Sequence, residues 1–325
     1  MEPLRRPAGR LVSIETVEPG MLTSVQDPSG RDAWRHLGVP VGGAADPWNA
    51  RLANRLAGND DDTALLEMTV SGPTLRFGQP ARVAISGGLD ASLDGVPFAA
   101  NTARDVRAGA LLRVGNGTGA RGYLAIGGGV NVEPVLGSAS TDVRTGFGGF
   151  EGRALRSGDR LEIGTRSSSG AYRWTGSWPA GPIRVVPGPH ADQFSPDALT
   201  GAAWRVGVEA DRTGVRLDGA APPSDALEVA SMALVLGAIQ VPPDRRPIMM
   251  LADRPVTGGY PVPAVVIGAD IGRVAQLRAG DQVRFASVSI EEARSALRRA
   301  ESELAALEAL DGPRDDELGW AGSHR

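Results

Sequence analysis

Short apolar runs that end at glycine-rich turns dominate this chain. The runs hold four to six residues and are rich in Val, Ile, Leu and Ala. They cover residues 82–85, 111–114, 123–126, 159–163, 183–186, 203–208, 238–241, 247–251, 264–267 and 282–286. Many short strands with glycine turns are typical of β-barrels and sandwiches, and not of a doubly wound parallel sheet. An Arg-Ala-Gly turn precedes the strands near 111 and 282, which indicates two related β units.

A helix is predicted after Asp46-Pro47. Aspartate is a favourable N-cap, and proline suits the first helical position. Trp48, Leu52 and Leu56 then follow at four-residue spacing. Gly58 is a typical helix stop. The pattern therefore predicts a helix that ends at Gly58.

Two further helices are predicted. A short one covers residues 195–199 and is capped by Ser195. A long one runs from Ser289 to about Leu310, and Ser289 and Glu292 have the spacing of a capping box. Its apolar stripe consists of Ile290, Ala293, Leu297, Leu304 and Leu307. The stripe predicts packing on the last barrel, with an oligomer contact as the alternative.

The domain organisation follows from one aperiodic segment. Residues 165–182 are rich in Ser, Gly and Pro, which indicates a join between two units. We therefore predict a mainly β fold with a few short helices. Its parts are an N-terminal β-barrel unit at 11–165, a linker at 166–182, a C-terminal β-barrel unit at 183–288, a C-terminal helix at 289–311 and a polar tail at 312–325.

Composition excludes several kinds of chemistry. The 325 residues carry a formal net charge of −4 and include no cysteine, and every basic side chain other than histidine is arginine. Thiolate catalysis, cysteine-bound zinc, a Schiff base, a biotinyl lysine and a Walker A lysine are thus excluded in this chain. Without a basic stripe, nucleic acid is not an expected partner. The absence of cysteine fits a cytoplasmic protein.

The chain gives no sign of a membrane segment or leader. The basic amino terminus is not followed by an apolar run, and the longest apolar run, residues 230–239, is about half a membrane span. We expect a soluble, cytoplasmic protein.

Standard catalytic motifs are missing. The sequence contains neither G-x-S-x-G nor H-E-x-x-H. Its three histidines, His36, His190 and His324, are far apart in the sequence. We therefore predict no metal site in this chain.

Three polar patches are the candidates for chemistry. The first holds Thr23, Gln26, Asp27 and Arg31, the second holds Ser138, Ser140, Thr141 and Asp142, and the third holds Gln240, Asp253, Arg254, Thr257 and Tyr260. Glutamine and aspartate beside arginine can fix an amide or carboxylate through paired hydrogen bonds. For each patch the alternative is that the side chains only tie down turns.

Longer motifs around these patches resemble one family. They read SVQDPSGR, GVPVGGAADPWNARLANRLAGN, GPTLRF, LGSASTD, GFGGFEGRALRSGD, GAIQVPPD, ADRPVTGGYP and AQLRAGDQVRF, and run from about Leu22 to Phe285. They are similar to the allophanate hydrolase subunit 2 family. That family is also called the 5-oxoprolinase C subunit, KipI antagonist or biotin-dependent carboxyltransferase-like family.

The resemblance implies a fold and partners. It implies two cyclophilin-like β-barrel units and a subunit 1 or KipI-like partner. With a LamB/YcsF-like third subunit, these form an ATP-dependent 5-oxoprolinase that opens the 5-oxoproline lactam to glutamate. The alternatives are the carboxyltransferase part of a urea-type, biotin-dependent carboxylase, with biotin carried elsewhere, and a non-catalytic regulator that binds a KipI-like protein.

The resemblance also guides the choice of site residues. The candidate catalytic residues are Asp27, Arg31 and Asp253, and the candidate substrate-binding residues are Gln26, Asp46, Asn49, Ser140, Thr141, Gln240, Thr257 and Tyr260. We expect the arginine to hold a carboxylate or phosphate, an aspartate to orient water or a substrate N–H, and the glutamines to contact an amide. ATP is expected at the level of the complex.

Three departures from the family motifs bear on the substrate. The usual V-S-G-A-M-D reads VGGAAD here, which puts Gly42 where a serine is usual. The usual D-R-Q-T-T-G-G-Y-P has Pro255 and Val256 in place of two polar residues. The usual Ser-Glu before the GAIQ strand reads Ser231-Met232. We expect these changes to alter the pocket more than the fold.

Overall fold

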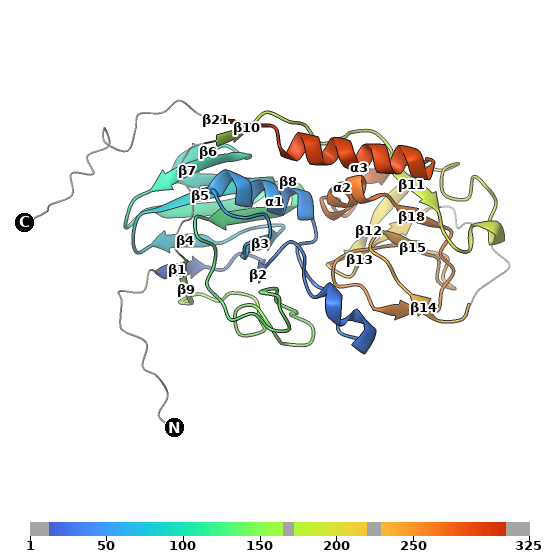
Figure 1. Cartoon of the computed structure of the whole chain (residues 1–325), viewed down its shortest axis with the longest axis horizontal. Coiled ribbons are helices and arrows are strands. Elements are labelled where there is room, and N and C mark those ends of the chain that lie inside the picture. The colour runs from blue at the N-terminus through green and yellow to red at the C-terminus, as the bar shows by residue number, and fades with distance from the viewer. Residues whose placement is uncertain (1–12, 165–171, 220–228, 310–325) are drawn as a thin grey trace, which may run out of the picture.

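The computed structural model describes residues 13–164, 172–219 and 229–309. Figure 1 shows two β-rich lobes side by side, with helix α3 (Ile290–Leu304) lying across the second lobe. Strands make up most of the regular structure, so the predicted mainly β class is confirmed. The predicted tail at 312–325 lies outside the described residues.

The first lobe is an eleven-stranded, nearly closed sheet. Its strands are β1 (Ser13–Glu18), β2 (Leu22–Gln26), β3 (Leu65–Thr69), β4 (Thr74–Phe77), β5 (Ala81–Leu93), β6 (Val96–Phe98), β7 (Thr102–Val106), β8 (Leu111–Ile126), β9 (Arg160–Glu162), β10 (Tyr172–Trp174) and β21 (Leu307–Ala309). The main path is β21-β10-β7-β5-β8-β4-β1-β9, and β3 joins β8 to β2. The long strand β8 thus pairs with three strands and connects both sides of the lobe.

Strand β8 corrects the sequence prediction of two runs separated by a glycine turn. Residues 111–114 and 123–126 belong to one continuous strand. It pairs antiparallel with β5, and the register shifts at Gly87/Leu89 and Leu89/Ala91. A Cβ at Gly117 would overlap the carbonyl oxygen of Gly88. Glycine therefore permits close strand approach here, and does not mark a turn.

The second lobe contains an eight-stranded sheet. Its strands are β11 (Ile183–Pro187), β12 (Trp204–Ala210), β13 (Gly214–Asp218), β15 (Ala238–Gln240), β16 (Ile248–Met250), β18 (Ala264–Val266), β19 (Gln282–Val283) and β20 (Phe285–Ser287), in the order β19-β12-β13-β16-β15-β18-β11-β20. Strands β14 (Met232–Ala233) and β17 (Thr257–Gly258) form a separate two-stranded sheet. The core of the lobe is apolar and includes Trp204, Leu217 and Ile239.

Helix α1 (Pro47–Ala57) confirms the first helix prediction. The Asp46 carboxylate accepts a hydrogen bond from the Asn49 amide at 3.1 Å, and Gly58 ends the helix in the left-handed region at φ 81°. The buried face of the helix includes Leu52 and Leu56, which pack in one apolar cluster with Tyr123 of β8. This packing fixes the N-terminus of α1 at the junction of the two lobes (Figure 1).

The short helix predicted at 195–199 is wrong. The segment forms turns, and a 3₁₀-helix, η2 (Ala191–Gln193), precedes it. The Leu199 carbonyl accepts a hydrogen bond from the Trp204 indole at 2.9 Å. A five-residue segment can form few i→i−4 bonds, so a helix there has little to stabilise it.

Helix α3 has the predicted start but a different end. Ser289 and Glu292 form the capping box, yet the helix stops at Leu304, because β21 then pairs with β10. Its buried side chains are Ala296, Ala300 and Leu304. In the predicted stripe, Ile290 and Leu297 remain 48% and 42% exposed.

The predicted domain boundaries stay predictions. The sheets show which lobe each segment near a boundary joins. Strand β10 lies within the predicted linker and belongs to the first sheet. The remaining elements are α2 (Ile271–Ala275), η1 (Asp32–Leu37) and η3 (Gly268–Asp270). In the described parts of the chain, no helix is long and apolar enough to cross a membrane.

Candidate active site between the two β units

The Asp27 carboxylate, just after strand β2, accepts hydrogen bonds from two loops. Its Oδ1 accepts hydrogen bonds from the Gly30 amide and the Ser140 hydroxyl, each at 2.8 Å. Its Oδ2 accepts from the Ser138 hydroxyl and the Ala139 amide, each at 2.7 Å. Two oxygens with four donors are saturated, so Asp27 fixes the loop around 138–140 to the end of β2.

Arg31 is buried beside this loop, with 1% of its surface exposed. Its Nε donates to the Val135 carbonyl at 3.0 Å, Nη2 donates to the Ser140 carbonyl, and the guanidinium lies 4.7 Å from the Phe147 ring centroid. Its Nη1 has no partner among the described residues. Burial lowers the pKa of Arg31, while nearby carboxylates, first Asp27, oppose the shift. Arg31 therefore keeps one unused donor in a tightly packed setting.

Gln26 and Thr141 are buried next to each other and share a hydrogen bond. The Gln26 Nε2 donates to the Ser24 hydroxyl and to the Thr141 carbonyl, each at 3.0 Å. The Thr141 hydroxyl donates to the Val25 carbonyl at 2.8 Å. The Gln26 Oε1 is buried and has no partner in the described parts of the chain. The first two predicted patches thus form one cluster, since Asp27, Ser140 and Thr141 are joined directly or through Gln26.

A second cluster joins the two lobes. Arg212, between β12 and β13, donates to both oxygens of Asp253, at 2.8 and 2.9 Å. Its Nη2 donates to the Gly43 carbonyl at 2.6 Å, and its Nη1 pairs with Glu67 of strand β3. Although burial opposes the charged form of Glu67, Arg212 and then Arg121 lower its pKa overall. Asp253 is therefore held through Arg212 to the first lobe.

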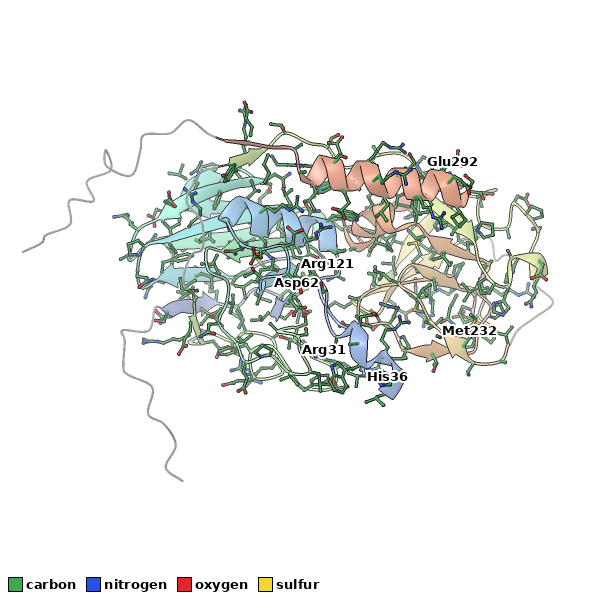
Figure 2. All side chains as sticks on the ribbon, viewed as in Figure 1. Arg31, His36, Asp62, Arg121, Met232 and Glu292 are labelled. Atoms are coloured by element: carbon green, nitrogen blue, oxygen red, sulfur yellow. The ribbon has the colours of Figure 1, made fainter. Side chains whose placement is uncertain are left out.

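The same network reaches the start of helix α1. The Tyr123 hydroxyl donates to Glu67 Oε2 at 3.0 Å and accepts from the Asp46 amide at 2.7 Å. The Arg121 guanidinium lies 3.5 Å from Glu67 Oε1. Figure 2 places Arg31 and Arg121 in the region where the lobes meet. Buried charges from both lobes are therefore neutralised by one another at the junction.

Asp46 and Asn49 line a cavity near the start of helix α1. Asp46 Oδ2 accepts from Asn49 Nδ2 at 2.6 Å and from the Gln276 amide at 2.9 Å. Burial raises the pKa of Asp46 in spite of these bonds. With Trp48 and Trp178 they border a space of about 240 Å³. Neither Asp27 nor Arg31 lines this space, so these two predicted residues lie apart from the Asp27 cluster.

Gln240, Thr257 and Tyr260 form a third group in the second lobe. Gln240 Nε2 donates to the Tyr260 carbonyl at 3.4 Å, and Gln240 is buried. Thr257 is exposed on β17. Among the described residues, no hydrogen bond or ion pair links this group to Asp27 or Arg31. The predicted site residues are therefore brought together in part.

A cavity of about 390 Å³ opens between the two lobes. Its wall from the first lobe includes Pro28, Arg35 and Gly42, and its wall from the second includes Val235, Ala252 and Arg254. The candidate catalytic residues lie behind this wall and do not line it. Asp27 precedes Pro28, Asp253 lies between two wall residues, and a Cβ on Gly42 would lie 3.4 Å from Arg31 Nη1.

Sequence reasoning missed several members of the site. They are Arg35, Glu67, Arg121, Tyr123, Arg212 and Gln276. One signal was available, because Glu67 is a lone carboxylate within the apolar run LLEM. Such a residue is seldom buried unless it is paired. Within the described ranges, no group of three or more His, Asp or Glu side chains is placed to hold a metal ion.

Comparison with known proteins places these features in a family. The chain matches a family model described as the carboxyltransferase domain, subdomains A and B, over residues 37–287. It is 37% identical to the C subunit of 5-oxoprolinase from Escherichia coli (strain K12) over 288 residues, which cover 86% of this chain and 93% of that protein. It is 34% identical to the urea amidolyase of Lachancea kluyveri over 335 residues, which cover 92% of this chain but 18% of that protein.

A solved structure agrees with this result. The crystal structure of the K. lactis urea amidolyase is similar with a TM-score of 0.84 and 30% identity, and the match covers 91% of this chain and 20% of that one. The chain thus spans about a fifth of the urea amidolyases and most of the 5-oxoprolinase C subunit. The resemblance seen in the motifs is confirmed, and the chain belongs to the carboxyltransferase-domain family that includes the C subunit of 5-oxoprolinase.

Proposed function

We propose that this chain is the C subunit of an ATP-dependent 5-oxoprolinase, which hydrolyses the lactam of 5-oxoproline to glutamate. The observation that carries the proposal is the 37% identity to the E. coli protein over 93% of its length. The active site is shared with a subunit 1 or KipI-like partner, and a LamB/YcsF-like protein is the third subunit.

The cavity between the lobes suits a small cyclic amide. Its volume of about 390 Å³ is in the range of small-molecule sites. Among the described residues, Arg31 Nη1 is an unpaired donor next to the cavity residue Gly42, and Gln26 Oε1 is an unpaired acceptor in the cluster around Thr141. In the proposed site Arg31 stabilises negative charge on the substrate, and Asp253 orients water or the lactam N–H. Asp27, whose acceptor positions are filled, positions the serine loop.

ATP acts at the level of the complex in this proposal. The chain has no lysine for a P-loop, so any phosphate contact from it comes from arginine or backbone amides. No metal bound by this chain is part of the proposal.

A carboxyltransferase role is the second candidate. It is favoured by the family description and by the similarity to the K. lactis urea amidolyase. Biotin would then be carried on another protein, because this chain lacks lysine. A neighbouring biotin carboxylase gene supports this role, whereas a neighbouring LamB/YcsF-like gene supports the 5-oxoprolinase.

The test is turnover by the assembled complex. The chain is co-expressed with its subunit 1 and third-subunit partners, and glutamate and ADP are measured with and without 5-oxoproline. We expect Arg31→Ala to slow turnover by about a hundredfold, as for loss of a group that stabilises developing charge. The matched control is Arg205→Ala, because Arg205 is exposed on β12.

Two results would contradict the proposal. If the Arg31→Ala complex is as fast as the wild type and as stable, the site assignment is wrong. If the wild-type complex forms but releases no ADP in response to 5-oxoproline, the 5-oxoprolinase role is wrong and the carboxyltransferase and regulatory roles are left.

A further inference from the structure

Two arginines from opposite lobes meet at the cavity between the lobes. Arg35 lies in η1 of the first lobe, and Arg254 follows β16 of the second. Both donate to one acceptor, the Leu234 carbonyl, from Arg35 Nη2 at 3.0 Å and from Arg254 Nε at 3.3 Å. Both also line the cavity of about 390 Å³. Two like charges, one from each lobe, therefore converge on one backbone carbonyl at the edge of this cavity.

Negative charge nearby is insufficient to balance this pair. Asp32 lies 3.4 Å from Arg35 Nη1, but its side chain is 72% exposed. The neighbouring carboxylate of Asp253 is engaged on both oxygens by Arg212. Among the described residues Arg254 forms no ion pair. The cavity thus holds surplus positive charge, which buried arginines seldom carry without a partner.

Arg254 is also poorly satisfied by hydrogen bonds. It is 6% exposed, yet its acceptors among the described residues are only the Leu234 carbonyl at 3.3 Å and the Leu251 carbonyl at 3.4 Å. Burial, and then the charge of Arg35, lower the pKa of Arg254 to about 10, with Asp32 opposing. At neutral pH Arg254 remains charged. A bound anion would therefore supply both the missing negative charge and a better hydrogen-bond acceptor.

Apart from Ser29 and Asp32, the rest of the wall is apolar. Val41 and Ala44 come from the first lobe, and Val235 and Leu236 from the second. An apolar wall with a few convergent polar groups is typical of small-molecule sites. A planar guanidinium matches the paired oxygens of a carboxylate or phosphate.

We propose that Arg35 and Arg254 together bind one anionic group, a carboxylate or a phosphate, of a small ligand held in the cavity between the two lobes. The ligand's identity rests on the proposed function: the carboxylate is that of 5-oxoproline and the phosphate that of the nucleotide or a phosphorylated substrate. The anion site itself stands on the geometry alone.

Titration calorimetry of the full chain tests the site with three probes. They are inorganic phosphate, L-5-oxoproline and 2-pyrrolidinone, which is the lactam ring without the carboxylate. We expect phosphate or 5-oxoproline to bind, with affinity that falls as salt is added. Arg254→Gln and Arg35→Gln each weaken binding by at least about tenfold, the effect of losing a charged hydrogen bond.

The control variant is Arg205→Gln, which removes the same charge from an exposed position on β12. It should bind as the wild type does. If Arg254→Gln does not fold, Arg35→Gln carries the test, because Arg35 keeps 28% of its side chain exposed. Arg254→Lys retains the charge and should recover part of the affinity.

The outcomes separate the site from the substrate. The proposal is overturned if neither anion binds the wild type at about 10 mM, or if both Gln variants bind as well as the wild type. If phosphate binds through the two arginines and 5-oxoproline does not, the anion site stands and 5-oxoproline is lost as its ligand. If 5-oxoproline binds at least about tenfold more tightly than 2-pyrrolidinone, the carboxylate is the recognised group.

Discussion

Glu67 of strand β3 and Arg212 of the β12–β13 turn form a buried ion pair across the junction of the two lobes. Arg212 also holds Asp253 of the second lobe and the Gly43 carbonyl of the first. Because each charge is buried, each depends on the other for compensation. The pair therefore fixes the walls of the candidate site relative to each other.

Removing the charge of Glu67 should destabilise the protein strongly. In Glu67→Gln the Arg212 charge stays buried with only Asp253 beside it, and we expect a loss of about 3 kcal/mol in the free energy of unfolding. Urea unfolding measures the change. The matched control is Glu308→Gln, which breaks an exposed pair with Arg173 and should cost at most about 1 kcal/mol. Equal losses of unfolding free energy in the two variants would show that the buried pair stabilises the protein no more than the exposed pair does.

The same pair predicts an acid-dependent loss of stability. The pKa of Glu67 is lowered in the folded protein from its ordinary value of 4.5. The folded state then binds fewer protons than the unfolded state, so the contribution is present above about pH 4.5 and is lost as the pH falls through the folded pKa. Denaturation midpoints between about pH 6 and pH 3 should fall less steeply for Glu67→Gln than for the wild type. Parallel curves would argue against this linkage.

Substitutions at Gly42 should report on the unpaired Arg31 donor. Gly42 has φ +64°, a region that costs other residues about 1 kcal/mol. A serine there, the usual residue in the family motif, can accept from Arg31 Nη1, whereas alanine cannot. We expect Gly42→Ser to be more stable than Gly42→Ala by about 1 kcal/mol. Thermal unfolding of the two variants side by side makes the comparison, and an alanine variant at least as stable as the serine variant would refute it.

Asp27→Asn should disturb the serine loop. An asparagine has an amide group where Asp27 now accepts from the Ala139 or Gly30 amide, so at least one buried donor loses its acceptor. We expect a loss of about 1–3 kcal/mol in unfolding free energy. Asp32→Asn is the control, because Asp32 is largely exposed. If Asp27→Asn keeps full stability yet abolishes turnover by the complex, Asp27 acts directly on the substrate.

Local signals in the sequence were enough for some elements. Helix α1 was predictable because its cap, first proline and terminal glycine are all within one segment. Among the candidate site residues, the sequence alone grouped only those that are close in the chain, as with Gln26, Asp27 and Arg31. Glu67 and Arg212 are 145 positions apart, so their pairing depends on how the two sheets meet. The same limit hid the pairing of Arg35 with Arg254, because their shared acceptor is apparent only in three dimensions.

The return of β21 to the first sheet has a mechanical consequence. Strands β1 and β21, the outermost described strands of the chain, both belong to that sheet, so the second lobe is an insertion between them (Figure 1). Tension applied through these two strands would load the first sheet before it reached the second. A single cut in the path between the lobes would likewise leave the fragments associated, because the chain crosses from one lobe to the other twice.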